Sequence, residues 1–197
     1  MPTPARTSLA EIVAAGRAAL AAGGLEALTM DRVAMSVGVR TPSLYKRVRN
    51  RSELVRLVIE DMIRELGATL DAAAGTGDPA DDLRALGHAF RAFARSQPYA
   101  FGLLFAATPD DARPDPATMP AAIQPVLRAT AGLAGADHAL PAARTLTAWI
   151  TGFLRMELAG AFQLGGDVDE AFEYGLDRLV RAFDERPSPA PTSRAMP

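Results

Sequence analysis

Helical periodicity is the feature that most restricts the fold of this chain. Apolar residues recur every three or four positions along most of it, as Leu9, Ile12, Val13, Gly16 and Leu20 do in the first segment. This spacing places them on one face of an α-helix. No run of strictly alternating apolar and polar residues is bounded by turn signals, so nothing predicts a β-strand. The chain is therefore predicted to be an all-α protein.

Cap and breaker residues divide this pattern into about nine predicted helices. The helices are expected at residues 9–20, 31–37, 42–47, 50–73, 79–96, 99–107, 117–133, 140–163 and 167–185. The expected N-caps are Thr29, Thr41, Asn50 with Glu53, Asp78, and Asp167 with Glu170. Gly23 or Gly24 is expected to end the first helix, Gly38 to break the second, and Pro125 to kink the seventh.

Composition sets the class of protein. Apolar residues make up 49% of the 197, enough for a sizeable core, and there is no Cys, which excludes disulfides, thiolate metal sites and Cys nucleophiles. The longest apolar run is far below the roughly 18 residues that span a bilayer. The first residues lack the apolar core of a signal peptide. We therefore expect a cytoplasmic protein that does not enter a membrane.

Neither catalysis nor metal binding is indicated. His88 and His138 are the only histidines, and neither belongs to a zinc-binding spacing. His88 is interpreted as an ordinary helix residue or a polar anchor in a cavity. Arg91 and Arg155 could each hold an acidic ligand or form a surface ion pair. No P-loop, dinucleotide fingerprint or Ser-His-Asp order is present, so we predict neither an enzyme nor a cofactor.

Positive charge is concentrated near the start of the chain. Residues 1–60 carry a net charge of +4, whereas the remainder carries −6. Within residues 37–54, no acid precedes Glu53, and the basic residues are Arg40, Lys46, Arg47, Arg49 and Arg51. A surface helix that needs only solubility normally mixes its signs. This asymmetry indicates that one end of the protein meets a polyanion.

Residues 31–47 have the dimensions of a helix-turn-helix. Ala34 permits close helix crossing, Gly38 permits a tight turn, and Val33, Val37, Val39 and Leu44 can pin the pair to the first helix. The predicted DNA contacts are Thr29, Arg40, Thr41, Ser43, Tyr45, Lys46, Arg47 and Arg51. Arg40 suits guanine, the hydroxyls suit phosphate or base edges, and Tyr45, Lys46 and Arg51 suit phosphates. The alternative is a solvated, arginine-rich hairpin that does not bind DNA.

The stretch LTMDRVAMSVGVRTPSLYKRVRNRSELVRLV, preceded by AALAAGGLEAL, resembles the DNA-binding domain of the TetR family of bacterial regulators. The family's recurring features stand at Thr29, Val33, Ala34, Gly38, Val39, Ser43, Leu44, Tyr45, Arg51 and Leu54. The resemblance covers about residues 9–60. It implies a homodimeric repressor whose two recognition helices read a palindromic operator. Asp31 departs from the pattern, because a carboxylate there disfavours phosphate contact and suits a helix-capping role.

The rest of the chain resembles one C-terminal subtype of the family, named for a Trp-His-Gly motif. Trp149, Gly152, Glu157 and Gly160 match it, whereas Thr151 replaces the histidine. The last two helices are expected to pair with their copies in a dimer. The predicted seam is Phe172, Leu176, Leu179, Val180 and Phe183. The alternative is that this stripe packs only within its own subunit.

A pocket for a small hydrophobic effector is expected among the same helices. Its candidate lining residues are Phe90, Phe93, Tyr99, Phe101, Phe105, Met119, Ile123, Leu127, Trp149, Phe153 and Met156. The alternative is that these residues form plain core.

The sequence thus predicts a helix-turn-helix domain at residues 1–50, a ligand-binding and dimerisation bundle at 51–186, and a disordered tail at 187–197. The predicted function is an effector-released repressor. The rival is a helical bundle that binds a lipophilic molecule without specific DNA binding.

Overall fold

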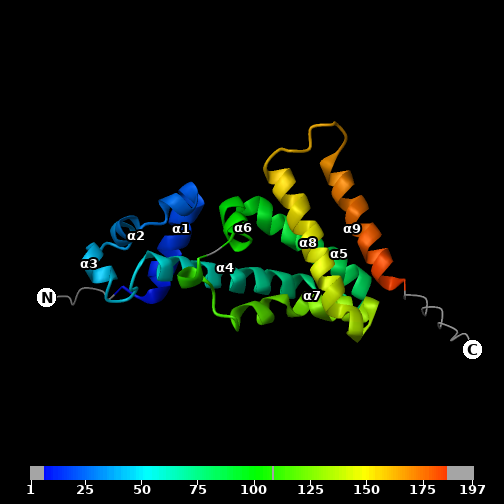
Figure 1. The fold of residues 1–197 in the computed structure, drawn as a ribbon, viewed down its shortest axis with the longest axis horizontal. Helices are drawn as coiled ribbons and strands as arrows, with labels where there is room; N and C mark the ends of the chain where they lie inside the picture. The colour runs from blue at the N-terminus through cyan, green and yellow to red at the C-terminus, as the bar shows by residue number, and fades with distance from the viewer. Residues whose placement is uncertain (1–6, 108, 186–197) are drawn as a thin grey trace, which may run out of the picture. The chain divides into compact units, whose positions relative to one another are not determined.

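The computed structural model describes residues 7–107 and 109–185, and within them every regular element is a helix. The α-helices are α1 Leu9–Ala27, α2 Met30–Ser36, α3 Thr41–Leu44, α4 Arg51–Ala73, α5 Pro79–Ser96, α6 Pro98–Leu104, α7 Thr118–Ala134, α8 Ala139–Leu158 and α9 Val168–Asp184. The α-helices are labelled in Figure 1. Two short 3₁₀ turns, η1 Asp110–Ala112 and η2 Ala136–His138, flank α7. The all-α prediction is confirmed.

The described residues pack as two compact units. The first contains residues 7–72 together with the described residues of 89–124, and the second contains residues 73–88 together with 125–185. Helices α5 and α7 each contribute to both units. This division follows packing, so the functional boundary predicted at residue 50 remains a prediction. The predicted tail at 187–197 lies outside the described residues.

Helix α1 begins with a capping box and contains a kink. The Ser8 hydroxyl accepts a hydrogen bond from the Glu11 N–H at 3.2 Å, and the Glu11 carboxylate accepts one from the Ser8 N–H at 2.7 Å. These bonds lower the pKa of Glu11. Gly23 and Gly24 leave helical geometry, but one further turn follows to Ala27. The predicted stop at Gly23 or Gly24 is therefore confirmed, and the further turn that follows it was not predicted.

Helix α4 begins as the Asn50 and Glu53 pattern predicts, with one difference. The Asn50 side chain accepts a hydrogen bond from the Glu53 N–H at 2.8 Å. The Glu53 carboxylate, however, accepts from the Arg49 N–H at 2.6 Å rather than from Asn50. This main-chain bond and the Arg49 guanidinium lower the pKa of Glu53. Only the reciprocal bond of the predicted capping box is thus displaced, by one residue.

Close approach of α1 to α4 organises the first unit. A Cβ at Gly16 would lie 2.8 Å from Val58 Cγ2, so the absence of a side chain allows the two helices to pack. The surrounding core contains Ile12, Leu20, Leu28, Leu54 and Met62, all almost fully buried. The α1–α4 packing gives the helix-turn-helix a fixed base.

In the second unit, α8 and α9 lie side by side and are joined by residues 159–167 (Figure 1). Helix α8 ends at Leu158, so the prediction that it reaches residue 163 is wrong. Gly160 has a φ of 62°, and the Ala161 N–H bonds the Met156 carbonyl oxygen at 2.9 Å. This left-handed arrangement terminates the helix one turn early.

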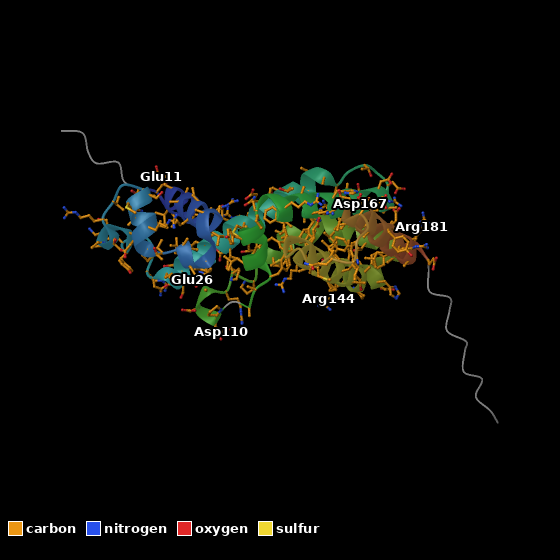
Figure 2. The ribbon with its side chains drawn as sticks, turned by 90° about the horizontal axis from the view of Figure 1, so that it is seen from above. Glu11, Glu26, Asp110, Arg144, Asp167 and Arg181 are labelled. Carbon is orange, nitrogen blue, oxygen red and sulfur yellow. The ribbon has the colours of Figure 1, made fainter. Side chains whose placement is uncertain are left out.

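Helix α9 begins as predicted at a capping Asp167, whose carboxylate accepts from the N–H groups of Asp169 and Glu170. Asp167 and Arg181 mark its start and its last turn (Figure 2). This charge order suits the helix dipole. The predicted cap of α5 is confirmed in the same way, since Asp78 accepts from two N–H groups of the first turn. Pro125 lies inside α7.

Candidate nucleic-acid interface and effector region

A tight turn between α2 and α3 shapes the helix-turn-helix. Gly38 has a φ of 71°, its N–H bonds the Met35 carbonyl oxygen at 3.2 Å, and the Val39 N–H bonds that of Ala34 at 2.9 Å. This is the hydrogen-bond pattern of a Schellman motif. Val33 and Leu44 are fully buried, as predicted, so the two helices are held at a fixed angle.

The exposed face of α3 and the turn after it is cationic. Arg40, Lys46 and Arg47 are exposed, and within the described part of the chain none of them forms an ion pair. Arg49 and Arg56, by contrast, both pair with Glu53. Positive charges without internal partners can neutralise phosphates without losing an existing bond. This face has the electrostatic character expected of a nucleic-acid interface.

The remaining α3 candidates differ in exposure. Ser43 and Tyr45 are exposed, with half of the Tyr45 surface open to solvent, so both could reach DNA. Thr29 is half-buried, and its hydroxyl accepts the Arg32 N–H at 3.2 Å, which confirms its capping role. Regular α-helix ends at Leu44 rather than at residue 47, and the chain continues as a turn.

The prediction that Thr41 caps α3 is wrong. Thr41 is the first residue of the helix, Arg40 occupies the N-cap position, and no side chain caps it. The Thr41 hydroxyl instead donates to Asp31 Oδ1 at 2.7 Å. This bond is not predictable from local sequence, because it joins residues from two helices.

Arg51 is engaged inside the chain. Its Nε donates to the Leu28 carbonyl oxygen at 2.8 Å, and Nη2 donates to that of Leu25 at 2.6 Å. These are carbonyls at the end of α1, where a cation is favourable. Arg51 therefore links the start of α4 to the end of α1. The remaining N–H groups of its guanidinium are the donors available for the predicted phosphate contact.

A polar network missed by the sequence reasoning connects α1, α4 and the start of α6. Arg17 donates to Asp61 Oδ2 at 3.1 Å and to Gln97 Oε1 at 2.9 Å, and it pairs with Glu65. Gln97 in turn donates to Glu65 Oε1 at 2.9 Å. Because Gln97 is the N-cap of α6, this network links that helix to α1 and α4, the two helices that support the helix-turn-helix. Residues so distant in sequence give no local signal.

Two concavities lie in the first unit. A groove of about 570 Å³ between α1 and α4 is lined by Leu9, Ala10, Val13, Ala14, Arg17, Leu57, Asp61 and Arg64. A smaller cavity of about 120 Å³ lies beside Arg17, Gln97 and Tyr99. Tyr99 is half exposed and packs on Gly24, where a Cβ would lie 3.2 Å from the ring. Tyr99 therefore contacts the kink of α1.

Three phenylalanines among the predicted pocket residues form an aromatic cluster in the first unit. The ring centroid of Phe90 lies 6.0 Å from that of Phe101 and 5.8 Å from that of Phe105, and those of Phe101 and Phe105 are 5.3 Å apart. Phe93 is buried, Ile123 is half-buried, and Met119 is exposed. The structure thus brings the phenylalanines together and leaves Met119 on the surface.

Trp149 and Phe153 belong to a second aromatic cluster, in the second unit. Trp149 stacks on Phe172 of α9 with ring centroids 5.5 Å apart, and Phe153 lies 5.3 Å from the same ring. A Cβ at Gly175 would overlap the indole, so Trp149 fills the space that this glycine leaves. Leu127 is half-buried and Met156 is exposed. For Trp149, this packing matches the core alternative that the sequence left open.

The residues of the predicted dimer seam differ in how deeply they are buried within the single chain. Phe172, Leu176 and Val180 are at most 2% exposed in the single chain, so they offer almost no area to a second copy. Leu176 packs over Gly87 of α5. Leu179 and Phe183 are half-buried. The first three residues therefore fit the alternative of packing within their own subunit, and a role at a dimer interface remains a prediction for the other two.

Ionisable side chains of α5 in the second unit lie close to carboxylates of α9. Arg84 of α5 donates to Asp177 of α9 at 2.8 Å, which raises the pKa of Arg84 and lowers that of Asp177. The Nε2 atom of His88 lies 3.4 Å from Oε2 of Glu173. Across residues 7–107 and 109–185, no group of three or more His, Asp or Glu could hold a metal ion. None of the described helices has both the length and the apolarity needed to cross a membrane.

These features define a helix-turn-helix protein with an all-helical C-terminal region. Residues 12–58 match the family profile described as bacterial regulatory proteins, tetR family, and residues 83–179 match a tetracyclin repressor-like C-terminal domain. The two segments together span most of the chain, and the chain belongs to the TetR family of transcriptional regulators. The residues of the narrower Trp-His-Gly resemblance lie in the second segment, and that subtype remains a prediction.

The chain is also similar to individual regulators. It is 30% identical over 99 residues to the HTH-type transcriptional regulators Rv1816 of Mycobacterium tuberculosis and Mb1846 of Mycobacterium bovis. Each match covers 49% of this chain and 42% of the relative, so the chain spans about two fifths of the length of these curated relatives.

Solved structures share the fold. The candidate regulatory protein SCO4313 has a TM-score of 0.70 and 29% identity, over 86% of this chain and 93% of its own. A variant of TetR from Acinetobacter baumannii AYE, solved in complex with minocycline, has a TM-score of 0.67 and 21% identity, over 90% of this chain and 97% of its own.

Proposed function

We propose that this protein is a repressor that binds a palindromic operator as a homodimer and is released by a small hydrophobic effector. The observation that supports the DNA-binding part is the group of exposed cations on the helix-turn-helix that form no ion pair with any other described residue, namely Arg40, Lys46 and Arg47. Such cations release counterions when they contact phosphate. The protein would act at operator DNA in the cytoplasm.

The dimer would place two α3 helices in successive major grooves. Half-sites one helical turn apart require recognition elements spaced by about 34–36 Å. Surface for the second copy is available on the last two helices, where Leu140, Met156 and Tyr174 are exposed large apolar residues. Leu179 and Phe183 would add to this surface. Burying such residues is the usual source of stability in a homodimer.

Release would depend on coupling between the C-terminal helices and the helix-turn-helix. The Arg17 network and the Tyr99 contact with Gly24 both join the start of α6 to α1. An effector that binds one arrangement of these helices better than the other would shift the population away from the DNA-binding state. The neighbour that binds minocycline supports the view that this fold can hold a small molecule. The effector of this chain is proposed only as a hydrophobic compound.

Selection of bound sites from random duplexes tests the proposal directly. The purified full-length protein is expected to enrich a palindrome with half-sites about one helical turn apart. Affinity for the selected site should exceed that for a shuffled duplex at every salt concentration. If the protein enriches no sequence but binds a lipophilic probe or anionic vesicles, the rival function of a lipophilic binder is correct.

A further inference from the structure

An acid interrupts the cationic face of the helix-turn-helix. Asp31, in the first turn of α2, is exposed, and its Oδ1 accepts the hydroxyl hydrogen of Thr41 at 2.7 Å. In the described part of the chain, no cation forms an ion pair with Asp31, although Arg32 and Arg40 are close in sequence. Phosphate repels an exposed carboxylate. The position of Asp31 therefore suggests contact with something other than the DNA backbone.

The bond between the two side chains limits what the Thr41 hydroxyl can still do. An ionised carboxylate has no hydrogen to donate, so the hydroxyl must be the donor. A hydroxyl has one hydrogen and two lone pairs, so its oxygen retains only acceptor capacity. Asp31 Oδ2 is also an acceptor, and among the described residues it has no hydrogen-bond partner. The pair consequently presents acceptors and no donor.

Only two bases offer a hydrogen-bond donor in the major groove. Cytosine presents its N4 amine and adenine its N6 amine, whereas guanine and thymine present acceptors at O6, N7 and O4. We infer that Asp31 and Thr41 form one specificity-determining unit, which selects adenine or cytosine at one position of each half-site through the exocyclic amine. Guanine or thymine at that position would set lone pairs against lone pairs. This inference rests on the proposed DNA-binding function.

The backbone around the pair holds it in place. Asp31 lies in a helix capped by Thr29, and Thr41 begins α3 directly after the Gly38 turn. Thr41 is half-buried, and its β-branched side chain has few rotamers. A preorganised pair discriminates bases better than a mobile one. The simpler reading is that Asp31 only stabilises the start of α2, which affects folding but not base preference.

Site selection with protein variants separates these readings. For the wild-type chain, we expect adenine or cytosine at one position of each half-site. Asp31→Ala should raise affinity for duplexes that carry guanine or thymine at that position, because a negative charge is lost, and should reduce the preference for adenine or cytosine there by roughly tenfold or more. Thr41→Val should also reduce it, whereas the matched control Thr41→Ser, which keeps the hydroxyl, should not. If Asp31→Ala changes affinity uniformly and leaves every base preference intact, the inference is wrong.

A second measurement needs no variant and so avoids any folding defect. In the selected duplex, purine replaces adenine, or pyrimidin-2-one replaces cytosine, at the assigned position, which deletes only the exocyclic amine. The wild-type protein should bind the altered duplex roughly tenfold more weakly. Unchanged affinity would overturn the inference and leave the proposed function intact. A wild-type protein that enriches no sequence would overturn both.

Discussion

The turn at Gly38 allows a prediction with a defined sign. Its φ of 71° lies in the left-handed region, and apart from its two chain neighbours no described residue has an atom within 4 Å of the position that a Cβ would take, so Gly38→Ala introduces backbone strain without a clash. The left-handed conformation costs an L-residue roughly 1–2 kcal/mol. Alanine also restricts the unfolded chain, which offsets about 0.4–1 kcal/mol of this cost. The expected net loss of stability is about 1 kcal/mol.

Urea unfolding at constant protein concentration measures this loss. With a slope of about 1–3 kcal/mol per molar urea, the midpoint for Gly38→Ala should fall by roughly 0.5 M. The urea midpoint of Gly38→Asn should fall less than that of Gly38→Ala, because asparagine tolerates the left-handed region. Gly102→Ala is a matched control in α6 of the same unit, where φ is not positive and nothing crowds a Cβ, so its midpoint should rise. An unchanged or higher midpoint for Gly38→Ala would refute the assigned turn.

Four further predictions concern charge and packing. Lys46→Ala should weaken binding to all duplexes and lower the salt slope by about one, whereas Arg113→Ala, at an exposed ion pair with Asp110, should not. Trp149→Phe should lower stability by about 1–2 kcal/mol, because the smaller ring leaves space beside α9; an unchanged thermal midpoint would contradict the packing. Arg17→Ala should weaken the effect of an effector on DNA affinity more than it weakens DNA binding itself, and equal losses would argue against coupling through its network. Hydrogen bonds from Arg49 lower the pKa of Glu53. The stabilising contribution of the Glu53 carboxylate should therefore be present above the ordinary pKa of a glutamate, and it should be lost as pH falls through the pKa of Glu53 in the folded protein. Glu53→Gln should remove that part of the acid dependence measured by unfolding across pH.

Features specified by neighbouring residues are predictable from the sequence. Asp78 and Asp167 are recognisable as caps because a carboxylate before a helix bonds N–H groups two or three residues later. Gly38 is recognisable as the turn because it follows an apolar helix and precedes another. The sequence predicts the end of α8 too late in the chain, because the adjacent pair Gly165 and Gly166 indicates a helix end more strongly than the single Gly160 does.

Features that depend on distant residues are not predictable in this way. The stripe on α9 shows which side of that helix is apolar, but not whether α5 and α8 or a second subunit covers it. Leu176 proves to pack over Gly87. Arg17 meets Gln97 eighty positions later in the chain. The Thr41 hydroxyl has a cap-like position in the sequence, and only the packing of α2 beside α3 gives it Asp31 as a partner.

The central claim is that the α3 surface gives sequence-dependent DNA binding. Its most direct test is the ratio of the dissociation constants for the shuffled and the selected duplex, measured over a series of salt concentrations. Phosphate contacts are common to both duplexes, so salt should weaken both, while base contacts should keep the ratio large. We expect a ratio of about a thousand or more that persists at physiological salt. A ratio near one at every salt concentration would contradict this claim.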